Sequence, residues 1–560
     1  MASSSLRLLL VLGLGLRITS TAVAAPAFNY SCIAEHCNDL YNFTGDGGFE
    51  APTKVVAVQA VPANSTTGVP AYCSVTAKID SLDGITTAVL YLPSEGEDWN
   101  GIVLGHGCGG SCGATGLDYV YGYGVSPVLG YGKEFLRQGY VIYNNDMGHN
   151  NTETKDTLSS WNAFRNNRTN ELNFAFLSTH LTTVSAKAMA EFYYGVPAWR
   201  SLFRGGSSGG RQGLVAAARY PHDYDGIVAA YGALNETAIG CVQYPYLAQV
   251  SRFPNGTHIL SMADLYALNA GAIAACDAND GVVDDVIDLS YHCDWDPITI
   301  LCASNTAVGA TGGSGCLENM DKVTAARAMY GFPSNFFSDQ LIVGRYTPGS
   351  ELSWSMWTAE AGVNFATSFC QNAAFQKDLP LSWSLNDYRW DADPYLLGPM
   401  EDLYTADFNG LKVYRDKGGK ILHYQGWADA SVSPGFNIEL YQSTIDEIGL
   451  NATKNFHRLF VYPGMAHIDI HSNVNGTIGW QADYLGMIND WLDSGVAPDR
   501  ILVKHWNMTT GAILNTRPYF AYPQTPKYIG GTNADLSNPE NWVGVIPDKI
   551  VRGRDYPWKT

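Results

Sequence analysis

The chain has 560 residues, of which 46% are hydrophobic and 16% are charged, so it is long enough to bury a large core and to form more than one structural unit. Its formal net charge of −19 argues against nucleic acid or an anionic membrane as a partner, although it says little about a small substrate. Beyond the first residues, no apolar run is long enough for a membrane-spanning helix, which needs about 18 residues.

Residues 1–24 are typical of a secretory signal peptide, with Arg7 as the positive end, an apolar run at 8–16 and a small-residue cleavage site at 22–24. We therefore expect a secreted, extracellular protein. In that setting the eleven cysteines indicate a disulfide framework with at least one thiol left over. Sequons of the form N-x-[ST] mark candidate glycosylation sites at Asn29, Asn42, Asn64, Asn150, Asn167, Asn235, Asn255, Asn451, Asn475 and Asn507.

Residues 26–80 are rich in turns, sequons and cysteines, and we expect them to form an extension attached to the main body. Strands are predicted at 86–93 and 102–104. The glycine-rich loop 105–113 follows the second strand directly. Such a loop either supplies an oxyanion-hole N–H, as in α/β-hydrolases, or is simply a flexible connection. A strand at 140–143 and an amphipathic helix at 186–194 come next.

The stretch 205–213 contains G-x-S-x-G with Ser207 at its centre, between a strand-like segment at 199–203 and a helix-forming segment at 214–219. A serine on a strand–turn–helix projects its hydroxyl above the sheet, and the flanking glycines let the backbone bend sharply. A bare G-x-S-x-G occurs by chance in a chain with 58 glycines, so the flanking strand and helix are what favour a serine hydrolase. With the strand predicted at 225–231, the alternation indicates an α/β fold with a mostly parallel sheet.

Between about 235 and 400, strand-like runs become rare, and we interpret this segment as an inserted domain that divides a catalytic domain into residues 25–234 and 401–560. Residues 276–286 place carboxylates around a glycine turn, a pattern that suits Ca²⁺, although it lacks the EF-hand spacing and a solvated acidic turn is the alternative. Natural local disulfide pairs are Cys276 with Cys293 and Cys302 with Cys316, although sequence does not fix connectivity. Cys241 with Cys370 is a further candidate pair across the inserted domain.

Strands are again predicted at 419–424 and 458–462, followed by a helix at 479–493. Asp429 follows the first of these strands and His467 follows the second. Ser207, Asp429 and His467 thus occur in the chain order of the α/β-hydrolase triad, each just past a strand, where catalytic groups of such sheets gather. The alternatives are an exposed turn carboxylate and a structural histidine. Weaker substitutes for these two roles are His423, His471 and Asp469.

These motifs resemble the fungal tannase and feruloyl esterase family, in particular its feruloyl esterase B-like members, over most of the mature chain. The residues that carry the resemblance are Trp99-Asn100-Gly101, Asp146-Met147-Gly148-His149, Phe192-Tyr193-Tyr194-Gly195, the segment 205–213, Arg219-Tyr220-Pro221, Tyr224-Asp225-Gly226-Ile227, the acidic loop 276–286, Gly426-Trp427-Ala428-Asp429 and Gly464-Met465-Ala466-His467. The resemblance implies an α/β-hydrolase core whose inserted domain, 235–400, is a lid. It implies Ser207 as nucleophile, with Asp429 and His467 as its partners. It also implies a structural Ca²⁺ held by Asp277, Asp280 and Asp284 and by the carbonyls of Val282 and Val286.

One departure from the family concerns the active site. Members usually carry a cysteine just before the nucleophile and another just after the histidine, and these two form a disulfide. Here Gly206 and Ile468 occupy those positions. We therefore predict an active esterase in which His467 is held by Asp429 and apolar contacts alone, with Ile468 among them.

The predicted reaction is ester hydrolysis through an acyl-enzyme, with no redox cofactor. His467 takes the proton of Ser207, and the oxyanion meets the N–H of Ser208 and an N–H from Cys108 or Gly109. The resemblance implies a phenolic ester as substrate, with a hydroxycinnamate on plant cell-wall polysaccharide preferred and a galloyl ester, making the protein a tannase, as the alternative. A hypothesis from another class is an inactive secreted carbohydrate-binding or interaction protein.

Overall fold

The structure is a computed structural model that describes residues 34–45, 50–94, 98–117, 131–150, 160–288, 290–303, 315–331, 346–406, 408–473, 476–531, 534–548 and 550. The predicted signal peptide at residues 1–24, Cys32 and the sequons at Asn29 and Asn475 lie outside the described residues. Within the described ranges, no helix combines the length and the apolar character needed to cross a membrane.

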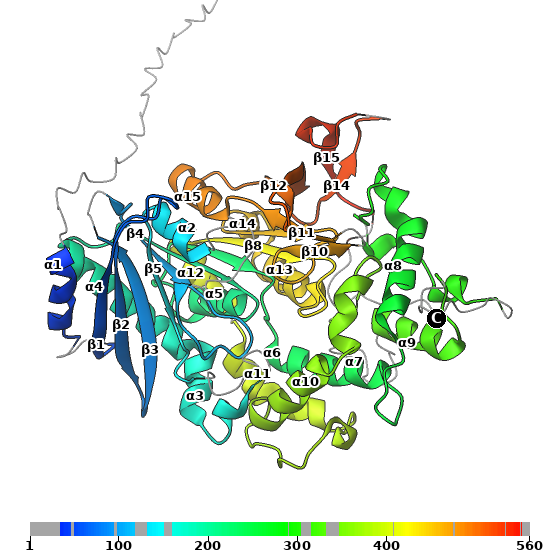
Figure 1. Cartoon of the computed structure of the whole chain (residues 1–560), viewed down its shortest axis with the longest axis horizontal. Coiled ribbons are helices and arrows are strands. Elements are labelled where there is room, and N and C mark those ends of the chain that lie inside the picture. The colour runs from blue at the N-terminus through cyan, green and yellow to red at the C-terminus, as the bar shows by residue number, and fades with distance from the viewer. Residues whose placement is uncertain are drawn as a thin grey trace, which may run out of the picture.

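A nine-stranded sheet runs through the centre of the molecule in the order β1-β2-β3-β5-β4-β6-β7-β8-β9 (Figure 1). Its strands are β1 (Thr53–Val61), β2 (Tyr72–Ser81), β3 (Gly84–Pro93), β4 (Ile102–His106), β5 (Val141–Asn145), β6 (Arg200–Gly206), β7 (Gly226–Ala230), β8 (Lys420–Gly426) and β9 (His457–Tyr462). Neighbours from β5 to β9 pair in parallel, whereas β1, β2 and β3 pair antiparallel and β3 joins β5 antiparallel. The α/β-hydrolase core with a mostly parallel sheet is therefore confirmed.

Helices cover both faces of this sheet. One face carries α4 (Ser178–Tyr194), α5 (Ser208–Arg219), α12 (Phe408–Asp416) and α13 (Pro434–Ile448), and the other carries α2 (Tyr131–Arg137) and α15 (Tyr484–Ser494). Shorter helices are α1 (Ala34–Cys37), α3 (Arg168–Leu172) and α14 (Leu450–Lys454). Consecutive strand residues such as Leu202 and Phe203 enter different cores on the two faces, which is why the parallel strands are apolar throughout.

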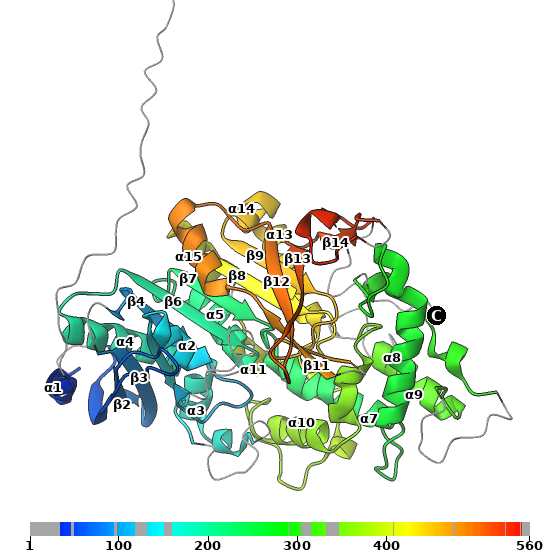
Figure 2. The same cartoon turned by 45° about the horizontal axis from the view of Figure 1, so that its top comes forward.

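Most of the segment between β7 and β8 forms a body of helices beside the sheet, coloured green to yellow-green in Figures 1 and 2. It contains α6 (Glu236–Ala238), α7 (Tyr244–Val250), α8 (Met262–Cys276), α9 (Met320–Tyr330), α10 (Ala361–Asn372) and α11 (Gly398–Tyr404), and its described residues include no strand. Its main core, in which Trp354, Tyr330 and Leu265 are buried, also includes Val432 and Phe436 from the segment that follows β8.

The ten described cysteines all form disulfides. Cys276 pairs with Cys293 and Cys302 with Cys316, and Cys241 pairs with Cys370 inside the inserted segment. The two remaining bridges are Cys37–Cys73 and Cys108–Cys112. Of the eleven cysteines in the sequence, only Cys32 is left, and it lies outside the described residues.

Two sequence expectations about secondary structure are wrong. Residues 26–80 are not merely an extension, because β1 and β2 belong to the central sheet, and alternate residues of β2, among them Val75 and Ile79, point into its core. The helix expected at 479–493 begins only at Tyr484, because residues 476–481 form a strand. That strand belongs to a second sheet of β10 (Ile470–Asn473), β11 (Gly476–Gln481), β12 (Arg500–Asn507) and β13 (Ile513–Phe520), and β14 (Thr525–Tyr528) pairs with β15 (Trp542–Val545).

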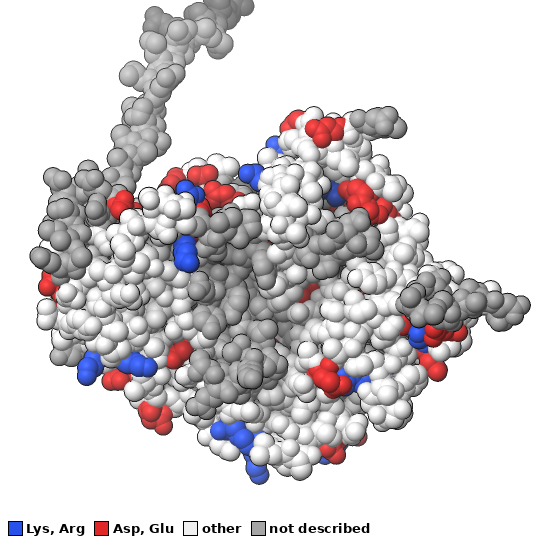
Figure 3. Space-filling view, viewed as in Figure 1, with Lys and Arg blue, Asp and Glu red and all other residues white. Residues whose placement is uncertain are grey.

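Most of the described side chains on the face shown in Figure 3 are uncharged, and its acidic and basic side chains lie scattered. The net charge of −19 is therefore not gathered into one patch on this face.

Candidate active site

Ser207 lies on the sharp turn between β6, which ends at Gly206, and α5, which begins at Ser208. Its backbone is left-handed, with φ 60° and ψ −126°, a conformation that costs free energy for a residue with a side chain. Three backbone hydrogen bonds hold it: Ser207 N–H donates to the carbonyl of Ala230 (3.0 Å), and its own carbonyl accepts from Arg211 and Ala233 (3.1 Å each). The turn therefore presents Ser207 at the carboxyl edge of the sheet, as the G-x-S-x-G pattern predicts.

Asp429 and His467 follow β8 and β9 and form a hydrogen bond with each other. Nδ1 of His467 lies 2.8 Å from Oδ2 of Asp429, whose side chain is fully buried, while that of His467 is 20% exposed. Oδ1 of Asp429 accepts the backbone N–H groups of Ser431 (2.9 Å) and Val432 (2.8 Å), and Gln425 donates to Oδ2 (3.1 Å). These hydrogen bonds orient the carboxylate of Asp429 toward Nδ1 of His467. The other ring nitrogen, Nε2, can then face a nucleophile.

Three side chains of the inserted segment hold the loop that carries Asp429. The hydroxyls of Tyr244 and Tyr346 donate to the carbonyls of Ser431 (2.7 Å) and Ala430 (2.6 Å), and that of Thr347 donates to the carbonyl of Trp427 (2.9 Å). No sequence pattern pointed to these residues, because a tyrosine that donates to a distant carbonyl has no local signature in the chain.

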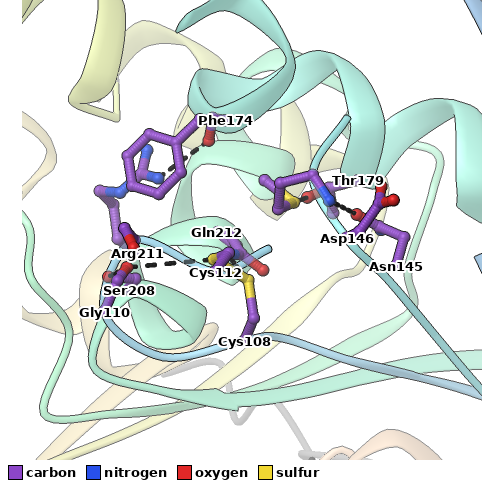
Figure 4. Close-up of a disulfide and its surroundings, with 12 residues drawn as sticks. Cys108, Gly110, Cys112, Asn145, Asp146, Phe174, Thr179, Ser208, Arg211 and Gln212 are labelled. Carbon is purple, nitrogen blue, oxygen red and sulfur yellow. Dashed lines mark hydrogen bonds between the residues drawn. A yellow bond between two sulfur atoms is a disulfide. The ribbon is translucent and has the colours of Figure 1, made fainter. Parts of the chain in front are cut away.

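The glycine-rich loop after β4 packs directly on the first turn of α5. A Cβ at Gly107 would lie only 2.5 Å from the Cα of Gly209, so a side chain there would separate the two segments. The Cys108–Cys112 disulfide closes the loop, with Gln212 beside it (Figure 4). The amide of Gln212 donates to the sulfur of Cys108 (2.9 Å). Ser208 donates from its hydroxyl to the carbonyl of Gly110 (2.7 Å). The backbones of Ser208, Cys108 and Gly109 thus lie together beside Ser207.

The Asp146–His149 motif contacts the glycine-rich loop through the ring of His149. The ring of His149 is buried, with Nε2 2.8 Å from the carbonyl oxygen of Ser111, and burial lowers the pKa of this imidazole. Asp146 accepts the N–H groups of Thr87 and Gly148 (2.9 Å each). The motif therefore has a structural role that the sequence left unassigned.

The two positions that lack cysteines are bridged by a tyrosine and a buried carboxylate. Gly206 faces the ring of Tyr231, while Ile468 is half-buried against the core. Next to Ile468, Asp469 is buried and accepts hydroxyl hydrogen bonds from Tyr231 (3.4 Å) and Tyr424 (3.3 Å). The ring of His467 is thus held by the hydrogen bond to Asp429 and by the ring of Tyr231, and the polar network at Asp469 supports the loop two residues further along the chain.

The weaker substitutes for the triad have other environments. His423 is buried beside His457 and Asn437, and burial lowers its pKa to about 4, so it is a neutral core residue. Burial raises the pKa of Asp469 to about 6, while the nearby Arg204 lowers it. The side chain of His471 lies outside the described residues.

The predicted calcium loop contains η7 (Asp277–Asp280) and gathers carboxylates around Arg517 from β13. This guanidinium forms ion pairs with Asp280, Asp284 and Asp288. One oxygen each of Asp284 and Asp288 is buried without a hydrogen-bond partner. One arginine thus faces an excess of buried negative charge, which suits a hard divalent cation.

The arrangement of the carboxylates in this loop suits Ca²⁺ less well than their charge and donor type do. Asp277 accepts the N–H groups of Asp284 (3.2 Å) and Asp285 (3.0 Å), and no three acidic, histidine or cysteine side chains in the described part of the chain are grouped as a metal site. The donors Asp277, Asp280, Asp284, Val282 and Val286 therefore fit Ca²⁺ in charge and donor type, and the ion stays a prediction.

Comparison with known proteins gives a consistent picture. Residues 73–542 match the family model described as "Tannase and feruloyl esterase". A probable feruloyl esterase B-1 of Aspergillus fumigatus is 27% identical over 69% of this chain and 72% of its own length. The mono(2-hydroxyethyl) terephthalate hydrolase of Piscinibacter sakaiensis is 26% identical over 91% of this chain and 92% of its own length. The crystal structure of feruloyl esterase B from Aspergillus oryzae superposes with a TM-score of 0.76 at 20% identity, covering 91% of this chain and 100% of that one, which is evidence for the fold alone.

Proposed function

Since this chain belongs to the tannase and feruloyl esterase family and is a carboxylic ester hydrolase, we propose that it is a secreted serine esterase that cleaves phenolic esters through an acyl-enzyme. Ser207 is the nucleophile, His467 the general base and Asp429 the residue that orients it. The observation that carries the proposal is the Asp429–His467 hydrogen bond of 2.8 Å beside the strained turn at Ser207.

In the proposed reaction, Nε2 of His467 accepts the hydroxyl proton of Ser207 as the oxygen attacks the ester carbonyl. Asp429 stabilises the imidazolium, and the oxyanion accepts hydrogen bonds from the N–H of Ser208 and an N–H of Cys108 or Gly109. His467 then protonates the departing alcohol. A water molecule, deprotonated by His467, cleaves the acyl-enzyme and releases the acid.

The preferred substrate in this proposal is a hydroxycinnamoyl ester, such as a feruloyl or p-coumaroyl group on plant cell-wall polysaccharide, and the alternative is a galloyl ester. The description of the matching family includes both activities, and one relative is named a feruloyl esterase. The test compares kcat/KM for methyl ferulate, methyl gallate and a terephthalate monoester, the last because of the Piscinibacter relative. Higher kcat/KM for the gallate would make the protein a tannase, and for the terephthalate would refute both.

An active-site probe separates an esterase from an inactive secreted binding protein. A fluorophosphonate should label wild-type protein at Ser207 and leave Ser207→Ala unlabelled. Absence of labelling in folded, calcium-supplemented protein would favour the binding protein.

Two accompanying features are part of the proposal. Export to an oxidising compartment is supported by the five disulfides and by the signal-peptide pattern at residues 1–24. A structural Ca²⁺ bound in the inserted segment would neutralise the carboxylates of Asp277, Asp280 and Asp284, and no step of the reaction depends on it.

A further inference from the structure

Tyr231, which directly follows β7, lies between the nucleophile turn and the histidine loop. A Cβ at Gly206 would lie 2.7 Å from both Cζ and the hydroxyl oxygen of Tyr231, so the tyrosine ring occupies the space that a side chain at position 206 would need. Gly206 itself is not in the left-handed region. The glycine is therefore required by the approach of Tyr231 and not by its own backbone conformation.

The same ring contacts the proposed general base. The ring centroids of Tyr231 and His467 are 4.9 Å apart with an interplanar angle of 61°, which is an edge-to-face contact. Such an edge-to-face contact is favourable and limits the rotation of the imidazole, which Asp429 holds through Nδ1.

The hydroxyl of Tyr231 continues the connection into the histidine loop. It donates to Oδ2 of Asp469 (3.4 Å), which also accepts from Tyr424 (3.3 Å) and lies 3.9 Å from the guanidinium of Arg204. Asp469 is 1% exposed and two residues after His467. The loop needs such support, because Ile468 (φ 61°) and Asp469 (φ 59°) are both left-handed, and strained residues persist only where their surroundings hold them.

Tyr231 is itself held in place at its backbone. Its φ of 34° is unusual for a tyrosine, and its N–H donates to the carbonyl of Tyr424 (2.7 Å). The residue is therefore fixed at three points: its backbone on β8, its ring between Gly206 and His467, and its hydroxyl on Asp469.

We propose that Tyr231 is a positioning residue for catalysis, which sets the imidazole of His467 relative to Ser207 by spanning from Gly206 to Asp469. Through packing and one hydrogen bond, Tyr231 joins the turn that carries Ser207 to the loop that carries His467. This inference rests on the proposed esterase function, and Tyr231 acts through His467 without touching the ester.

A kinetic double-mutant cycle tests the proposal. Tyr231→Ala should lower kcat by about 10- to 100-fold with little change in KM, because a displaced base leaves ground-state binding intact. Tyr231→Phe keeps the ring and should recover most of that loss. Gly206→Ala should lower kcat in the wild type by displacing the ring, and should have no further effect in Tyr231→Ala, where the ring is absent.

The control and a second measurement separate positioning from general stability. Tyr414→Phe removes a hydroxyl bond of similar burial, from Tyr414 to the carbonyl of Lys420 (3.2 Å), far from the triad, and should leave kcat unchanged. Independently of activity, the low-field proton resonance of the His467–Asp429 hydrogen bond should be present in the wild type and shifted or lost in Tyr231→Ala.

The outcomes are distinguishable from those for the function itself. A wild type that fluorophosphonate does not label refutes the esterase, and the resonance still reports on Tyr231. The positioning role is overturned if Tyr231→Ala keeps both kcat and the resonance, or if the kcat losses of Gly206→Ala and Tyr231→Ala simply multiply.

Discussion

Replacing Asp429 by asparagine tests the triad with almost no change in volume. In the structure, Oδ1 accepts two backbone N–H groups, from Ser431 and Val432, and Oδ2 faces Nδ1 of His467. The single oxygen of an asparagine would remain with the two backbone donors, because turning its NH₂ toward them would leave both unpaired at about 1–3 kcal/mol each. The NH₂ group would then face Nδ1 of His467.

A donor at that place selects the wrong histidine tautomer. Nδ1 must become the acceptor, so the proton moves to Nε2, which then cannot take the proton of Ser207. The same change in a serine-protease triad lowers kcat by about 10⁴-fold, which corresponds to about 5 kcal/mol of transition-state stabilisation. We expect a loss of this order in Asp429→Asn, with KM little changed.

The assay is hydrolysis of whichever methyl ester the wild type turns over, together with the rate of fluorophosphonate labelling at Ser207. The control is Asp490→Asn, which makes the same charge change at an exposed residue of α15 and should leave both rates unchanged. If a folded Asp429→Asn variant kept kcat within about tenfold of the wild type, Asp429 would not set the tautomer and the reasoning would be refuted.

Three other measurements follow from the buried charges and from the sequons. Burial raises the pKa of Glu236 to about 7, although Arg211 at 3.7 Å lowers it, so the folded state binds more protons than the unfolded state between pH 4.5 and about 7. The free energy of unfolding should therefore fall as pH rises through that window, and Glu236→Gln should remove about 3 kcal/mol of this fall. Urea unfolding at several pH values measures it, and the same pH dependence in the wild type and the variant would contradict the reasoning. Chelation should lower the Tm, and added Ca²⁺ should restore it, because Ca²⁺ at a hundredfold excess over Kd adds about 3 kcal/mol to the free energy of unfolding. The Tm of Asp280→Asn should respond to neither treatment, and a wild-type Tm that responds to neither would exclude the ion. Mass spectrometry should find a glycan on Asn255, which lies in an exposed turn. Asn235 should carry none, because its side chain accepts from Ala238 (3.0 Å) and donates to Glu401 (2.8 Å). A glycan on Asn235 would show that its side chain does not make these two hydrogen bonds.

Local patterns were enough to predict the core of the fold and the order of its triad. The strands β3 to β9 are apolar runs bounded by turns, and the glycines on both sides of Ser207 indicate the turn there. The first turns of α4 and the strands β1 and β2 were missed, although β1 is a mostly apolar run and β2 alternates between buried and exposed residues. The pairing of β1 with β2 and of β2 with β3 is what makes these two strands part of the central sheet.

The sequence by itself therefore determined which residue types follow which strands: Ser207, Asp429 and His467, the glycine-rich loop and the acidic loop at 276–286. The tertiary structure alone decided what holds them, namely Tyr244 and Tyr346 on the loop of Asp429, Tyr231 between Gly206 and His467, and Arg517 among the carboxylates. The reason is physical. A turn or a strand is specified by neighbours in the chain, whereas a tyrosine that fills the space beside a distant glycine is specified only by the packing that brings the two together.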